Sequence, residues 1–60
     1  MTDTELDRVY TLLCKTMTDL GESRSQLFLA RFALLAIERL DNPQAAESLI
    51  ADASEDMANA

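Results

Sequence analysis

The stretch SQLFLARFALLAIERL, residues 25–40, decides how this chain folds. With successive residues set about 100° apart, its apolar side chains cover an arc of about 220°, whereas an ordinary surface helix carries a stripe little wider than about 100°. Arg24, Arg31 and Glu38 fall on one narrow polar line beside that arc. The stretch is therefore predicted to be a central helix that other elements cover on several sides.

The residues before this stretch predict an amphipathic helix over about residues 3–20. Thr2 and Glu5 have the spacing of a capping box, and Gly21 is placed to end the helix. Apolar residues recur at spacings of three and four, with Val9 widening the face that they form. The members of this face are Leu6, Tyr10, Leu13, Met17 and Leu20.

Two further capping signals divide the rest of the chain. Ser23 with Gln26 predicts the start of the second helix, over about residues 24–40. Asn42 as N-cap and Pro43 as first residue predict a third helix over about residues 43–57. Carboxylates crowd the end of this helix, where the dipole disfavours anions, so residues 54–60 are expected to fray.

Short connections make consecutive helices neighbours, commonly antiparallel. The predicted fold class is therefore all-α, a single domain of residues 1–60 with three short antiparallel helices and the second at its centre. A chain of 60 residues buries only about 60% of its unfolded surface and is marginally stable alone. One cysteine excludes an internal disulfide, and the absence of histidine argues against a zinc site. Association with a partner is the remaining means of stabilisation.

The charge of the chain limits its partners. A net charge of −6 argues against binding nucleic acid or an anionic membrane surface. The acidic opening MTDTELDR is unlike a signal peptide, and the longest apolar run in residues 25–40 is far shorter than the about 20 residues that span a membrane. With a lone thiol, these features predict a cytoplasmic protein, and Cys14 is expected to be a buried structural thiol.

Coverage of the second helix locates a candidate interface. The first helix and the bulky residues of the third, Leu49, Ile50 and Met57, are expected to cover the arc from Leu29 round to Leu34. An apolar edge beside the arginines would stay exposed and form a protein interface. Its predicted residues are Tyr10, Leu12, Arg24, Phe28, Arg31, Phe32 and Leu35. The partner is a second copy of the chain, as in a two-fold homodimer, or a larger protein with a receiving groove; a loosely packed monomer is the third possibility.

The sequence gives no positive sign of catalysis. Without histidine, acid–base chemistry would fall to carboxylates, Lys15 or Tyr10, and no carboxylate pair lies inside an apolar stripe. We expect no catalytic, metal or cofactor site. Arg31 has two interpretations: it pairs with Glu38 or with acids of the first helix, or it faces a partner and binds a carboxylate there.

Three segments, DRVYTLL, DLGES and FLARFALLAIERLDN, resemble the small bacterial proteins grouped as domain of unknown function 2783. The matching positions are Tyr10, Leu13, Leu20, Ala30, Arg31, Leu34 and Leu35. The family carries a histidine near the end of the first helix, where this chain has Met17, so a role for that histidine does not carry over. Because such proteins are often encoded beside flavin-dependent aromatic monooxygenases, the resemblance implies an accessory subunit of such an enzyme.

These features together predict a non-catalytic helical interaction module, a homodimer or a small accessory subunit of a larger cytosolic enzyme. The alternative is an acidic regulatory or antitoxin-like protein that blocks a basic partner.

Overall fold

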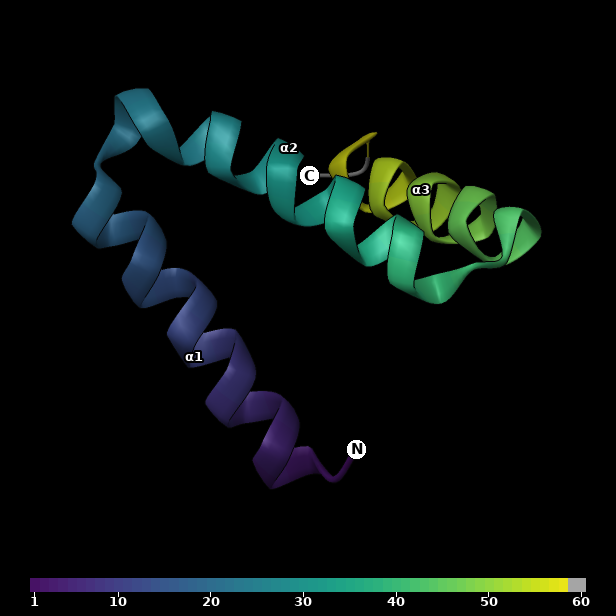
Figure 1. Ribbon diagram of the computed structural model, residues 1–60, viewed down its shortest axis with the longest axis horizontal. Helices are drawn as coiled ribbons and strands as arrows, with labels where there is room; N and C mark the ends of the chain where they lie inside the picture. The colour runs from purple at the N-terminus through teal and green to yellow at the C-terminus, as the bar shows by residue number, and fades with distance from the viewer. Residues whose placement is uncertain (59–60) are drawn as a thin grey trace.

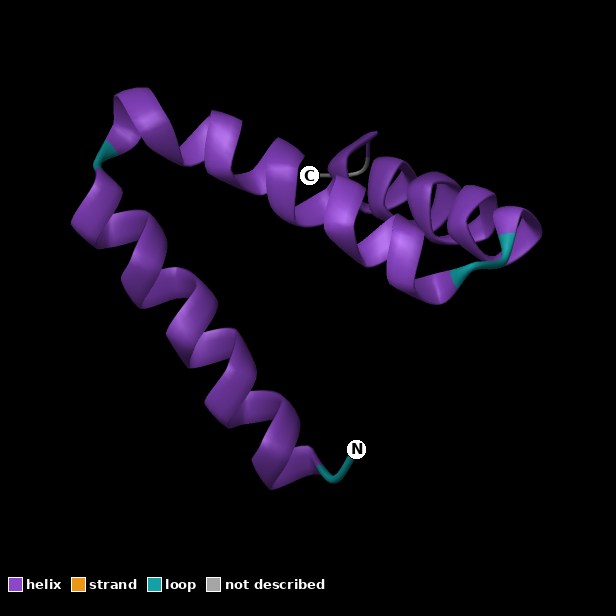
Figure 2. Cartoon of the chain, in the orientation of Figure 1, coloured by secondary structure: helices purple, strands orange, loops and turns teal. Residues whose placement is uncertain are grey.

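The computed structural model describes residues 1–58 and consists of three α-helices joined by very short links (Figures 1 and 2). They are α1 (Asp3–Leu20), α2 (Glu22–Leu40) and α3 (Pro43–Ala58). The all-α class is confirmed, as are the bounds of the first helix, and the third extends one residue beyond its predicted end. The described residues contain no strand.

Local hydrogen bonds at the predicted caps explain where α1 and α3 begin. The Thr2 N–H donates to Oε1 of Glu5 at 2.7 Å, and the Glu5 N–H donates to Oγ1 of Thr2 at 3.1 Å. This reciprocal pair is the predicted capping box. At the third helix, Oδ1 of Asn42 accepts a hydrogen bond from the Ala45 N–H at 3.1 Å, which confirms Asn42 as the N-cap before Pro43.

The start of α2 differs from the prediction. This helix begins at Glu22, two residues early, and its N-cap is Gly21, which is also the C-cap of α1. Gly21 has φ 83° and ψ 165°, and its carbonyl accepts the Ser25 N–H at 3.0 Å. The capping box predicted at Ser23 is wrong because the glycine backbone already starts the helix, which places Ser23 inside its first turn.

The link between α2 and α3 is a left-handed residue followed by the cap of the next helix. Asp41 has φ 50° and ψ 39°, and its N–H donates to the Ile37 carbonyl at 3.2 Å. Aspartate is one of the few residues other than glycine that is enriched in this conformation. The turn reverses the chain, so α3 runs back in the opposite direction to α2 (Figure 1).

The three helices form an open arrangement. Gly21, the single residue between α1 and α2, is here called the elbow. In Figure 1, α1 and α2 diverge from it like the two arms of a V. Among the described residues, no two positions twelve or more apart in sequence bring their Cα atoms within 8 Å. The radius of gyration is 12.9 Å, against about 10.4 Å for a compact chain of this length. Helices therefore meet near the turns and separate beyond them.

This openness overturns the expected coverage of α2. Leu29 and Leu34, at the two ends of the arc assigned to the core, are 36% and 57% exposed. Among the side chains that the structure describes, only Ala46 is buried. Cys14 is exposed as well, so its assignment as a buried thiol is wrong. The physical reason is shared: both neighbours of α2 lean away from it after the first turns.

The C-terminal end of α3 is helical through Ala58. The fraying predicted for residues 54–60 concerns motion and stays a prediction, and its last two positions, residues 59–60, lie outside the described residues.

The backbone conformation of Gly21 leads to a first testable prediction. Gly21 occupies a backbone region that is essentially restricted to glycine, where another residue costs about 1–3 kcal/mol. A Cβ at this position would meet no atom within 4 Å. We therefore expect Gly21→Ala to lower the free energy of unfolding by about that amount through backbone strain alone, measured by urea denaturation followed by circular dichroism.

Gly21→D-Ala, made by chemical synthesis, is the matched control, because a D residue prefers the mirror-image backbone regions. It adds the same methyl carbon without the strain and should preserve stability. An equal loss with both residues would contradict the explanation.

Candidate functional site

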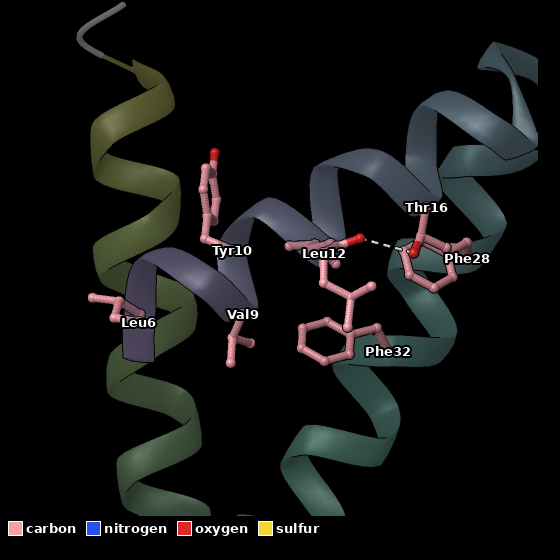
Figure 3. A pocket seen from close by; sticks show the side chains of 8 residues that line it. Leu6, Val9, Tyr10, Leu12, Thr16, Phe28 and Phe32 are labelled. Carbon is pink, nitrogen blue, oxygen red and sulfur yellow. Dashed lines mark hydrogen bonds between the residues drawn. The ribbon is translucent and has the colours of Figure 1, made fainter. Parts of the chain in front are cut away.

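An apolar groove of about 470 Å³ lies between the two arms of the V (Figure 3). Its lining comes from one face of α1 and the first half of α2. The lining residues are Leu6, Val9, Tyr10, Leu12, Leu13, Thr16, Phe28 and Phe32. Leu6, Val9, Tyr10 and Leu13 belong to the apolar face that the sequence predicts, and Leu12 and Thr16 lie beside it. Because α1 leans away from α2, that face lines an open groove instead of closing onto the partner helix.

The groove-lining side chains range from half-buried to largely exposed. Leu13, Thr16 and Phe28 are half-buried. Leu6 is 54% exposed and Leu12 is 64% exposed. The groove therefore leaves apolar side chains open to contact with another molecule.

Two aromatic rings of α2 form one wall. The ring centroids of Phe28 and Phe32 are 6.5 Å apart, and their planes are inclined by 18°. This separation is within the range in which aromatic pairs attract one another beyond the area that they bury. Phe32 projects from α2 toward α1 in Figure 3 and is 47% exposed. The pair provides a broad apolar contact surface that one turn of α2 holds in place.

Polar groups in the groove are few. The Thr16 hydroxyl donates to the Leu12 carbonyl at 2.8 Å, within its own helix (Figure 3). Within the described part of the chain, no charged side chain lines the groove. Small-molecule sites combine an apolar wall with several convergent polar groups that orient the ligand. This groove has the wall without those groups, which favours an apolar protein surface as its occupant.

The predicted interface residues divide into those at the groove and those beside it. Tyr10, Leu12, Phe28 and Phe32 line the groove. Leu35 lies in a second, smaller hollow of about 330 Å³ on α2, which Phe32 also lines. Four of the seven residues predicted from the sequence are therefore gathered at one site.

The two predicted arginines lie outside the groove. Nε of Arg24 donates to the Leu20 carbonyl at 3.4 Å, across the elbow. The Arg31 side chain makes no hydrogen bond or ion pair with any described residue. The interpretation in which Arg31 pairs with Glu38 or with acids of the first helix is therefore wrong. The partner-facing interpretation stays a prediction.

Leu6, Val9, Leu13 and Thr16 line the groove without having been predicted as site residues. The signal for the first three was present, since the helical spacing of residues 3–20 places them on one apolar face. They were assigned to the core because that face was expected to close onto the second helix. Thr16 carried no signal of its own.

A shifted pKa is found at the start of α1, next in sequence to the groove-lining Leu6. Hydrogen bonds from Thr2, first from its backbone N–H and then from its side chain, lower the pKa of Glu5 below its ordinary value. The cause is the capping box, so this pKa reports on helix structure. Among the described residues, no three Asp, Glu or Cys side chains gather as metal ligands.

The fold and the groove define a small all-α protein with an uncovered apolar surface between two helices. Comparisons with protein-family models, with curated proteins and with solved structures find no match to this chain. The resemblance to domain of unknown function 2783 stays a prediction. None of the helices, within the described residues, combines the length and hydropathy needed to cross a membrane.

The capping box formed by Thr2 and Glu5 leads to a second testable prediction. Because the folded-state pKa of Glu5 is lowered, the stability that its carboxylate contributes is complete above the ordinary glutamate pKa. That contribution is lost as the pH falls through the lower, folded-state pKa. We expect the first turn of α1 to unwind over this acidic range, measured by the amide chemical shifts of Thr2 and Glu5 in an NMR titration.

Glu5→Gln serves as the control, since its amide oxygen still accepts the Thr2 N–H hydrogen bond but does not titrate. Its first-turn shifts should change less than those of the wild-type protein over the same pH range, since Asp3 is then the remaining carboxyl in that turn. Replacing Thr2 by Pro removes both the backbone N–H and the hydroxyl, so it should move the pKa of Glu5 back toward the ordinary value. A pKa of Glu5 unchanged by that substitution would show that the cap is not its cause.

Proposed function

We propose that this protein is a non-catalytic helical interaction module of the cytoplasm, acting as a homodimer or as a small accessory subunit of a larger cytosolic enzyme. The observation that carries the proposal is the uncharged apolar groove between α1 and α2. Exposed apolar surfaces of this kind, unlike single scattered residues, mark interaction sites.

The energetics of the exposed side chains support an interface. Leu6, Tyr10 and Leu12, three groove-lining residues of α1, are each more than half exposed. Fully burying a large apolar side chain is worth about 1.5–3 kcal/mol, while a whole domain is stable by only about 5–15 kcal/mol. Covering the exposed part of these three side chains would contribute about 3–5 kcal/mol, a substantial part of such a total.

The chemistry of the groove supports a role without catalysis. General acid–base catalysis needs a titratable side chain within hydrogen-bond reach of the substrate. The polar side chains at this groove are those of Tyr10 and Thr16, and the Thr16 hydroxyl already donates to the Leu12 carbonyl. The groove thus offers apolar area for contact and few groups that could carry out a reaction.

The accessory-subunit form of the proposal draws on the resemblance described above. The segments DRVYTLL and FLARFALLAIERLDN contribute to both arms of the V. On the basis of this resemblance, a flavin-dependent monooxygenase is the candidate enzyme, and part of its surface would occupy the groove. The chain itself would need no cofactor for this role.

The charge distribution favours a second candidate, an acidic regulatory or antitoxin-like protein that blocks a basic partner. By sequence, α3 carries four carboxylates and no cationic residue. Such a concentration of one sign attracts basic surfaces. In this case the binding surface would be α3, and the groove would be secondary.

Phe32 provides a direct test of the groove, because it lines both hollows on α2. Phe32→Asp places a charge in the proposed interface and should weaken association by about 2 kcal/mol or more, roughly thirtyfold in Kd. The measurement is the mass of the native complex by light scattering over a dilution series. Phe32→Leu is the control and should retain most of the affinity; an unchanged affinity for Phe32→Asp would place the interface elsewhere.

Salt dependence separates the two candidates. The screening length falls from about 10 Å at 0.1 M to about 3 Å at 1 M ionic strength, which weakens attraction between exposed charges. An interface made by the apolar groove should keep its affinity over this range, measured by sedimentation. A loss of association at high salt would favour the acidic-blocker function.

A further inference from the structure

The exposed surface of the chain is too large for a compact monomer. Its accessible surface is 5533 Å², whereas a compact protein of 6.7 kDa exposes about 3,900 Å². About 1,600 Å² per chain is therefore uncovered in excess of what this size requires. The excess measures how much surface a binding partner has to cover.

The size of this excess indicates the kind of interface. If two copies each bury about 1,600 Å², the total is about 3,200 Å², inside the range of about 2,000–5,000 Å² seen for obligate homodimers. A standard interface buries only about 800 Å² per partner and would leave half of the excess exposed. The uncovered area therefore matches a permanent, largely apolar interface.

The groove has apolar walls from two helices, so a helix with apolar residues on two sides could contact both walls. α1 itself has this form: Leu6, Val9 and Tyr10 lie on its stripe, and Leu12 lies to one side of it. All four side chains are between 45% and 64% exposed. An amphipathic helix laid into an apolar groove is a common mode of recognition. The chain thus carries both the groove and a helix able to fill it.

The charges of the helices favour the same pairing. In α1, four carboxylates and two cationic residues give a net charge of −2, and in α2, two carboxylates and three arginines give +1. α3 carries four carboxylates and no cation, a net charge of −4. Since α2 alone is net positive, it is the helix against which an α1 from another copy is best placed.

From these observations we propose that a second copy of this chain fills the groove. α1 of each copy lies in the groove of the other, against its α2, in a dimer with two-fold symmetry. Each α1 then lies between α2 of its own chain and α2 of the second copy, as neighbouring helices do in a four-helix bundle. This proposal rests on the proposed function and names the partner.

The first test compares two leucines of similar exposure. Leu12 is 64% exposed and lines the groove, whereas Leu34 is 57% exposed and lines neither hollow. Wild-type protein should have twice the mass of the chain by light scattering. Leu12→Asp should raise the dimer Kd about thirtyfold or more, and Leu34→Asp by at most about twofold. Equal effects of the two substitutions would overturn the proposal.

Circular dichroism checks that both variants keep their helix content. If Leu12→Asp loses helix, the pair Leu12→Ala and Leu34→Ala replaces it, because alanine is the best helix former. Leu12→Ala is then expected to dissociate, and Leu34→Ala is expected to stay dimeric.

The second test uses the single cysteine of the chain. A spin label on Cys14, which is exposed and outside the groove lining, gives one label per molecule. Any distance between labels is then a distance between two chains. We expect a single defined distance in the wild-type protein, retained in Leu34→Asp and lost in Leu12→Asp. Absence of a defined distance in wild-type protein would overturn the dimer.

A third measurement separates failure of the dimer from failure of the proposed function. Labels at Asp3→Cys and Arg39→Cys, in a Cys14→Ser chain diluted with unlabelled protein, report the separation of the two arms of one V. If the protein is a monomer whose arms stay apart, the dimer is overturned, and a larger protein remains the proposed occupant of the groove. A monomer whose arms close together overturns both proposals.

Discussion

A single glycine determines how the rest of this structure is arranged. Gly21 ends α1 and begins α2 with no other residue between them, and its backbone lies in a region that other residues rarely enter. With no loop to bend, the direction of α1 relative to α2 is set by this one residue. The groove, the exposure of both apolar faces and the open shape all depend on that direction.

The elbow has an energetic consequence for α2, the most apolar helix. Its neighbours meet it only near its two ends, so Leu35, which lines the second hollow, stays more than half exposed in the free chain. The hydrophobic effect favours removing this area from water, and here only another molecule can do so without changing the elbow. Folding and association would then be linked, as in obligate dimers whose stability depends on protomer concentration.

Features that depend on short-range interactions were predicted correctly from the sequence, whereas features that depend on how the helices are placed were not. Thr2, Glu5, Asn42 and Pro43 act within one helical turn, and their spacing alone predicted the caps and most helix bounds. Helical periodicity also predicted which faces are apolar, and thus four groove residues. It carries no information on how far the axis of a neighbouring helix lies away. The coverage of α2 and the burial of Cys14 were wrong for that reason. The start of α2 was wrong because the backbone of Gly21 itself begins that helix.

The acidity of the chain is compatible with association through the groove. Two copies at −6 repel one another, but charges farther apart than about 8 Å are largely screened at physiological ionic strength. Within the described residues, the groove lining is uncharged, and the helix with the largest negative charge, α3, contributes nothing to it. Apolar contact at the groove can therefore form while the carboxylates of α3 stay in solvent. A net charge held on the outside also limits association beyond the copies that fill one another's grooves, because further chains would meet an acidic surface.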